Sequence, residues 1–149
     1  ASAVLPLSRP PLIREHRLYQ SDWLMRFYGY KPAEVMQATD VDGNLPLDID
    51  PKLAWALKFR ENFPLDVNRA SREQMLRVPG LGVRAVDRIV ASRRHRTLRL
   101  DDVAKLTVSI AKVRPFICTV DWRPVTLTDR ADLRSLLAPR REQLELFAA

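Results

Sequence analysis

The pattern of apolar and polar positions predicts a chain made almost entirely of short helices. Apolar residues recur every three or four positions from Leu12 to Tyr28, which is the repeat of one helix face, and Gly29 is typical of a helix end. A second short helix is expected over residues 32–38. Asp50-Pro51 joins a capping side chain to a first-turn proline, so a third helix is predicted to run to about Arg60.

The second half of the chain continues this pattern. Ser71 and Gln74 have the spacing of a capping box, and their helix must end at Pro79-Gly80. Further helices are predicted at residues 83–93, after a cap at Asp101, at 111–115 and at 129–137. Residues 116–120 are apolar and fit either a short strand or an extended packing segment. The expected fold is mostly α, a bundle of short helices.

The excess positive charge lies on one third of the chain. The net charge is +7, and residues 68–100 hold nine arginines against Glu73 and Asp87, whereas the basic and acidic residues elsewhere cancel. These arginines are Arg69, Arg72, Arg77, Arg84, Arg88, Arg93, Arg94, Arg96 and Arg99. A concentrated basic segment attracts polyanions, and guanidinium groups match phosphate in two-point contacts. A solvated basic face without a partner is the alternative.

Composition excludes several classes of protein. A chain of 149 residues can bury a core, and no apolar run approaches the roughly 18 residues of a membrane span, so no membrane partner is expected. Residues 1–7 lack the basic start and long apolar stretch of a secretion signal, which predicts a cytoplasmic location. Cys118 is the only cysteine, so no internal disulfide can form.

The run Pro79-Gly80-Leu81-Gly82 between two short helices is the most specific local signal. Both glycines allow a positive φ and leave no Cβ between the backbone and a ligand, while Leu81 can point into the core. The N–H groups from Gly80 through Ala85 then face outward where the next helix begins, which predicts an anion site. A tight glycine turn that only packs two helices is the alternative.

This segment resembles the helix-hairpin-helix family of DNA-repair and competence proteins. The resemblance starts at Asp66-Val67-Asn68-Arg69-Ala70, includes residues 76–82 and extends to Leu106. It implies that the N–H groups of four residues bind a DNA phosphate, namely Gly80, Gly82, Arg84 and Ala85. It also implies a monovalent cation, K⁺ or Na⁺, held by the carbonyls of Leu76, Val78 and Leu81.

Together, the turn and the charge predict one DNA-binding surface. Its residues are Gly80, Leu81, Gly82, Val83, Arg84 and Ala85 in the turn and the helix start, with Arg77, Arg88, Arg93 and Arg94 beside them. Family members often pair two hairpins, and the second would fall at residues 107–110, which contain no glycine. We therefore expect a degenerate second hairpin that packs but binds phosphate poorly.

A narrower resemblance covers residues 10–122. Residues 11–29, 50–57 and 114–117 are similar to the C-terminal region of the bacterial putative DNA modification/repair radical SAM proteins. The CxxxCxxC cluster motif of that family is absent, so neither cluster nor catalysis is expected in this chain. The expected organisation is an N-terminal helical segment at 1–62, ending or linking a missing barrel, a helix-hairpin-helix domain at 63–122, and a helix and tail at 123–149.

Three functions are considered, and one of them, a nuclease or other enzyme in its own right, lacks the clustered acids or the nucleophile–base pair that it would need. The chain is expected to be a non-catalytic module that binds single- or double-stranded DNA for a repair or modification enzyme. In the alternative, the hairpin packs against the missing catalytic part without binding DNA. Trp23, Trp55 and Trp122 could stack on bases, but their apolar neighbours favour core packing.

The tail predicts a protein partner. Gln143-Leu144-Glu145-Leu146-Phe147 resembles the short peptide with which bacterial repair and replication proteins bind the sliding clamp. There the glutamine, here Gln143, fixes the register, and the side chains at Leu144, Leu146 and Phe147 would contact the clamp. An amphipathic terminal helix is the alternative.

Overall fold

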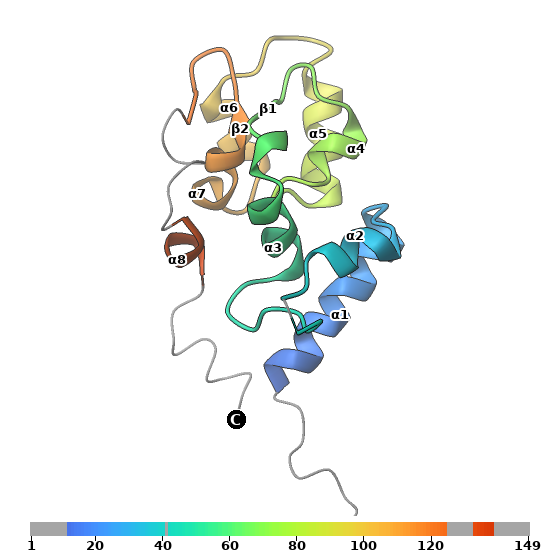
Figure 1. Ribbon diagram of the computed structural model, residues 1–149. Coiled ribbons are helices and arrows are strands. Elements are labelled where there is room, and N and C mark those ends of the chain that lie inside the picture. Colours follow the sequence, from blue (N-terminus) through green and yellow to red (C-terminus); the bar gives the residue numbers. More distant parts are fainter. Residues whose placement is uncertain (1–11, 41, 125–132, 139–149) are drawn as a thin grey trace, which may run out of the picture.

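The computed structural model describes residues 12–40, 42–124 and 133–138, and this part of the chain is mostly helical, which confirms the predicted class (Figure 1). The α-helices are α1 (Leu12–Phe27), α2 (Pro32–Gln37), α3 (Pro51–Lys58), α4 (Arg72–Met75), α5 (Val83–Ser92), α6 (Leu100–Leu106), α7 (Ile110–Val113) and α8 (Leu133–Leu137). The other elements are the 3-10 helices η2 (Arg60–Asn62) and η3 (Arg114–Phe116) and the strands β1 (Leu65–Asp66) and β2 (Ile117–Cys118). None of the described helices is long and apolar enough to cross a membrane.

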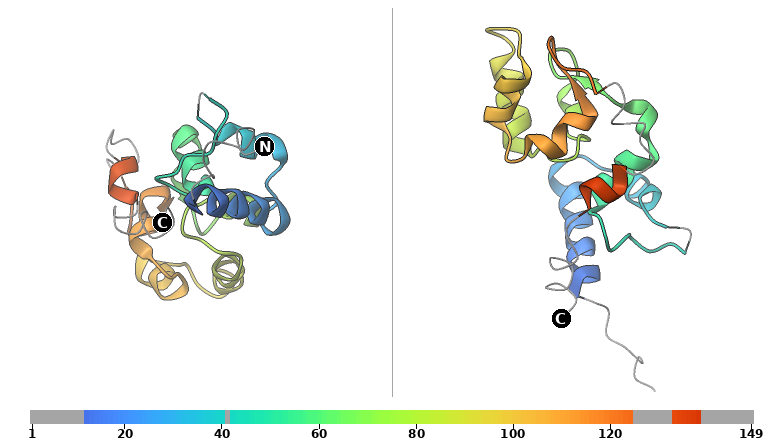
Figure 2. Two further views of the ribbon diagram at one scale, coloured as in Figure 1. Left: turned by 90° about the horizontal axis from the view of Figure 1, so that it is seen from below. Right: turned by 90° about the vertical axis from the view of Figure 1, so that its left-hand side faces the viewer.

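The first three helices match their predicted positions. Gly29 has a φ of 72°, so the chain turns after α1, and the Tyr30 N–H returns to the Leu24 carbonyl at 3.2 Å. The Asp50 side chain accepts the Leu53 N–H at 2.7 Å and caps α3 as predicted. Helix α3 packs against both α1 and α2, and the turned views show α1 projecting away from the strands (Figure 2).

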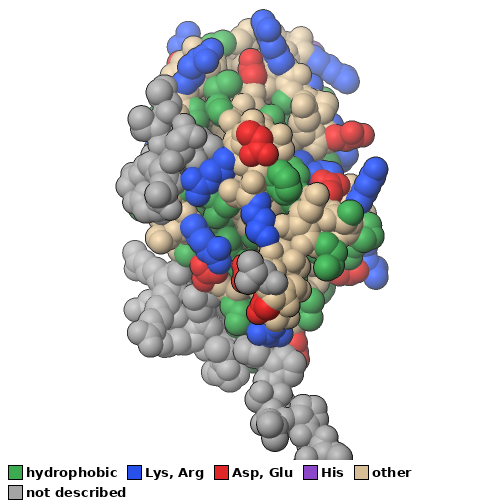
Figure 3. All heavy atoms as spheres, viewed as in Figure 1, with side chains coloured by type: hydrophobic (Ala, Val, Ile, Leu, Met, Phe, Trp, Pro, Cys, Tyr) green, Lys and Arg blue, Asp and Glu red, His purple; other side chains and the backbone are tan. Residues whose placement is uncertain are grey.

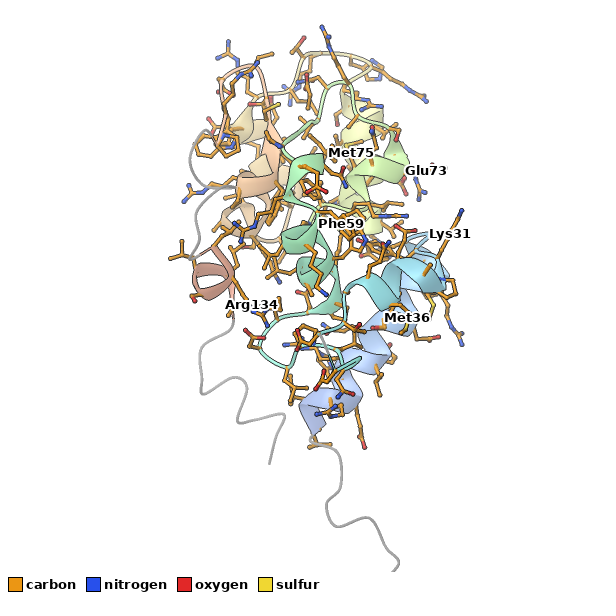
Figure 4. All side chains as sticks on the ribbon, in the orientation of Figure 1. Lys31, Met36, Phe59, Glu73, Met75 and Arg134 are labelled. Atoms are coloured by element: carbon orange, nitrogen blue, oxygen red, sulfur yellow. The ribbon has the colours of Figure 1, made fainter. Side chains whose placement is uncertain are left out.

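The capping box that precedes α4 is confirmed. The Ser71 hydroxyl accepts the Gln74 N–H at 3.1 Å, and the Gln74 side chain accepts the Ser71 N–H at 2.9 Å. Helix α4 nevertheless ends at Met75, before the predicted stop, because the Val78 N–H bonds the Met75 carbonyl in a tighter turn. Met75 is buried, whereas Glu73 on the same helix points outward (Figure 4).

The predicted cap of α6 was wrong. The helix begins at Leu100, and the Asp102 carboxylate, not Asp101, accepts the Arg99 N–H at 2.9 Å. The Leu100 N–H donates to Asp121, which is 21 positions away, at 3.0 Å. Asp101 remains in the first turn as an exposed acid, so the free N–H groups at this helix start are satisfied by one local and one distant carboxylate.

A two-residue parallel ladder joins distant parts of the chain. Leu65 pairs with Ile117 and Asp66 with Cys118, so residues 117–118 of the apolar segment 116–120 form a short strand. The partner strand β1 was not predicted, because two residues show no alternation. Beside it, the Asn68 side chain forms two bonds with the Leu98 backbone at 2.8 and 3.1 Å, which joins the segment after β1 to the chain that follows α5.

Nearly all buried apolar side chains of the described residues form one cluster that extends from Leu24 to Leu133. Trp55 lies in it, with its ring edge-on to Tyr30 and Phe63, so the expectation of core packing is confirmed for this tryptophan. Helix α8 is held to the 45–50 loop by a two-point ion pair between Arg134 and Asp48, at 2.8 and 2.5 Å (Figure 4). This bonding also lowers the pKa of Asp48.

Candidate nucleic-acid interface

The turn between α4 and α5 requires a glycine at position 80. Gly80 has a φ of 87°, and a Cβ there would lie 2.8 Å from the Val113 Cγ2 atom of α7. Leu81 is buried as predicted, and its N–H bonds the Val78 carbonyl at 3.1 Å. The positive φ expected at Gly82 was wrong: its φ of −80° is open to any residue, and a Cβ there would meet only the Tyr28 hydroxyl, at 3.5 Å.

The N–H groups at the start of α5 form the anion-binding feature of this turn. Gly82 is the N-cap of α5 and has no side-chain cap, and its carbonyl already accepts the Val86 N–H at 3.0 Å. The Val83 backbone hydrogen-bonds to Tyr28, a bond that opposes the rise in the pKa of Tyr28 caused by burial. Within the described residues, the N–H groups of Gly82, Arg84 and Ala85 have no acceptor. These donors are free for a ligand.

A buried lysine lies directly behind the turn. Lys52 donates to the Leu81 carbonyl at 2.6 Å, and its ammonium stands 4.5 Å from the centre of the Tyr28 ring. No carboxylate of the described chain forms an ion pair with it, since Asp50 is paired instead with Lys112 at 3.1 Å. Burial lowers the pKa of Lys52 to about 7, against the opposing effect of Asp50.

The same contact bears on the expected cation site. Of the three implied carbonyl ligands, Leu81 already accepts the Lys52 ammonium and Val78 accepts the Leu81 N–H. A second positive charge at Leu81 would meet the first at close range. The residues therefore do not fit a K⁺ or Na⁺ ion while Lys52 is protonated.

The predicted arginines fall into two groups. The Arg77 guanidinium pairs with Glu34 at 3.0 Å, donates to the Tyr28 carbonyl at 2.9 Å and stacks 4.1 Å from the centre of the Tyr30 ring. Arg93 donates to the backbone carbonyls of two residues, Val67 at 3.1 Å and Ala70 at 2.5 Å. These two side chains hold segments of the chain together and are not free for phosphate.

The second group remains available. Arg84, Arg88 and Arg94 are exposed, and within the described residues none of them forms a salt bridge. Arg84 and Arg88 lie on α5, one turn apart, and Arg94 follows its end. In the space-filling view, basic side chains surround the upper end of the molecule, over the chain that follows α5 (Figure 3).

A cavity of about 500 Å³ opens beside the turn. The backbone of residues 80–82 forms one side of it, the start of α3 with Lys52 a second, and α1 a third. Val108, the exposed residue between α6 and α7, lies at its edge, so the segment predicted as a second hairpin lies near the first. Sequence reasoning missed Lys52 and Tyr28, because a single lysine and a single tyrosine carry no pattern.

The aromatic residues of α1 correct another expectation. Trp23 is 44% exposed and lines the cavity, so core packing was the wrong interpretation of this residue. Tyr19 and Phe27, one turn away on either side, are 59% and 50% exposed. The ring centres are 6.0 Å apart for Tyr19 and Trp23 and 4.2 Å apart for Trp23 and Phe27. The helix thus carries three neighbouring aromatic rings that are each about half exposed.

Comparison with known proteins adds no relative: no family model, curated protein or solved structure matches this chain. Both family resemblances therefore remain predictions from the sequence. The peptide of residues 143–147 lies outside the described part of the chain.

Proposed function

We propose that this chain is a sequence-independent DNA-binding module of a repair or modification protein. Residues 76–82 form the phosphate-binding hairpin of a helix-hairpin-helix motif, and residues 107–110 form a degenerate second hairpin. The observation that carries the proposal is the set of N–H groups at Gly82, Arg84 and Ala85, which lack acceptors in the described chain and lie in its most basic third. The chain supplies binding and no catalysis.

The chemistry of these donors explains why binding would ignore sequence. Backbone N–H groups and guanidinium groups bind phosphate oxygens, which are the same at every base pair. Gly82 has no side chain, so a phosphate can approach the N–H groups closely. Arg84 and Arg88 extend the contact along α5, and Arg94 adds charge beyond its end.

The first prediction concerns salt. DNA affinity is expected at roughly 10⁻⁴ to 10⁻⁶ M near physiological salt and should fall steeply as salt rises. The double change Arg84→Ala/Arg88→Ala should lower affinity at low salt and reduce the slope of log K against log salt by about 2. Fluorescence anisotropy with labelled DNA of two unrelated sequences measures both quantities.

A matched control keeps this test specific. Arg123→Ala also removes one exposed arginine, but that residue lies beside Cys118, at a separate cavity, and should change the slope little. An equal effect for each arginine removed would indicate general charge attraction without specific phosphate binding at the turn. No DNA binding at low salt would favour the alternative, in which the turn packs against another protein part.

The tail provides a separate prediction. We propose that residues 143–147 bind the bacterial sliding clamp, with Leu146 and Phe147 as apolar anchors. Leu146→Ala/Phe147→Ala should abolish capture of the chain by immobilised clamp and leave DNA affinity unchanged. Leu136→Ala, which removes an exposed leucine from α8, is the control. Clamp capture that persists in the double variant would refute this proposal.

A further inference from the structure

We propose that the cavity between α1 and the 80–82 turn receives an unpaired nucleotide, so that the module prefers single-stranded DNA. This inference rests on the proposed DNA-binding function and adds strandedness to it. Three features of the cavity carry it: two half-exposed aromatic rings, a buried ammonium group and the free N–H group of Gly82.

The aromatic rings favour a flat ligand. Helix α1 buries Leu24 against the core, yet it leaves the rings of Tyr19 and Trp23, which line the cavity, and of the neighbouring Phe27 about half exposed. Exposed rings in succession are the surface on which single-stranded nucleic acids stack their bases, and such stacking tolerates any sequence. A duplex keeps its bases stacked on each other and cannot present a free base face.

The buried ammonium group favours an anion. Lys52 has one carbonyl acceptor and no ion-pair partner within the described chain, and an unpaired buried charge is costly. Asp50, which also lines the cavity, is already engaged by the Leu53 N–H and by Lys112, so its charge is largely compensated. A nucleotide phosphate would supply the missing negative charge, and its binding would favour the protonated form of Lys52 that burial alone disfavours.

The geometry joins these two features to the turn. The 80–82 backbone borders the same cavity as Trp23 and Lys52, and Gly82 leaves its N–H accessible. A volume of about 500 Å³ falls within the range of small-ligand pockets. One phosphate at the turn would therefore leave the attached base beside the ring of Trp23.

A protein partner would match this surface less well. An apolar protein surface could cover Tyr19 and Trp23, but it would leave the Lys52 charge and the Gly82 N–H group without partners. Only an anion with an attached ring system satisfies all three features. The observations therefore favour a nucleotide over a protein as the occupant.

The test compares oligo(dT) with an oligo(dA)·oligo(dT) duplex of equal length, using the whole chain. The unmodified protein should bind oligo(dT) more tightly, and its tryptophan fluorescence should be quenched. Trp23→Ala should weaken oligo(dT) binding roughly tenfold and change duplex binding by less than about twofold. Leu18→Ala is the matched control, because this exposed residue of α1 does not line the cavity.

The outcomes separate this inference from the proposed function. If the unmodified chain binds both DNAs equally and Trp23→Ala changes neither affinity, the cavity takes no base, but the DNA-binding proposal stands. Equal losses for both DNAs also overturn the single-strand preference. If neither DNA binds, both proposals fail. Trp23→Phe keeps a ring and should retain oligo(dT) binding while losing most of the quenching, which guards against misfolding of the alanine variant.

Discussion

Gly80→Ala is expected to destabilise the folded chain by roughly 2–4 kcal/mol, the largest effect of any small substitution in the turn. Two independent effects, an unfavourable backbone conformation and a steric clash, both reduce the free energy of unfolding. The φ of 87° is unfavourable for any residue with a Cβ, and that Cβ would lie 2.8 Å from Val113 and 3.3 Å from the Lys112 Cβ. Both neighbours belong to α7, so relief of the clash would move α7 away from the turn.

Gly82→Ala is the matched comparison. Its φ of −80° suits alanine and its Cβ would have room, so the stability loss should stay below about 1 kcal/mol, as for a weakened N-cap. The methyl group would nevertheless stand between a phosphate and the free N–H groups at the start of α5, and DNA affinity should fall roughly tenfold. Urea unfolding gives the stabilities, and anisotropy titration gives the affinity of the folded variant. A folded Gly82→Ala protein with unchanged DNA affinity would falsify the proposal that the turn binds phosphate.

The second large effect is a pH dependence of stability that comes from Lys52. Burial holds the pKa of Lys52 at about 7 in the folded chain, whereas an unfolded lysine titrates near 10.4. Between these values the unfolded chain binds a proton that the folded chain does not. The free energy of unfolding should therefore rise with pH, by up to about 1.4 kcal/mol per unit, and this contribution should be lost as pH falls to 7.

The measurement is the free energy of unfolding of the unmodified chain minus that of Lys52→Met at each pH. Groups that titrate alike in both proteins contribute nothing to this difference. Asp50, Arg77 and Lys112 act on this ammonium group and remain in the variant. The measurement should stop at about pH 9.5. Burial also raises the pKa of Tyr30, so above that pH Tyr30 ionises in the unfolded chain and lowers the free energy of unfolding, which opposes the effect of Lys52. A difference that stays flat from pH 7 to 9.5 would show that Lys52 remains charged in the folded chain.

The sequence alone determined most helices and several of their caps. A capping box at Ser71 and Gln74, a cap at Asp50 and a stop at Gly29 act within one or two turns, so neighbouring residues decide them. The turn at Gly80 and the basic third of the chain were also evident, since both are contiguous. These contiguous features locate the candidate interface without any knowledge of packing.

Tertiary structure decided which side chains are free to act there. Arg77 and Arg93 belong to the basic third, yet distant carbonyls and Glu34 engage them, and charge counting cannot detect such partners. Trp23 and Trp55 have similar apolar neighbours, but only Trp55 lies where other helices converge. Lys52 lies behind the turn because α3 packs there, 29 positions away in sequence. Its buried charge, and with it the anion site that we propose, depends on contacts between segments that no local pattern encodes.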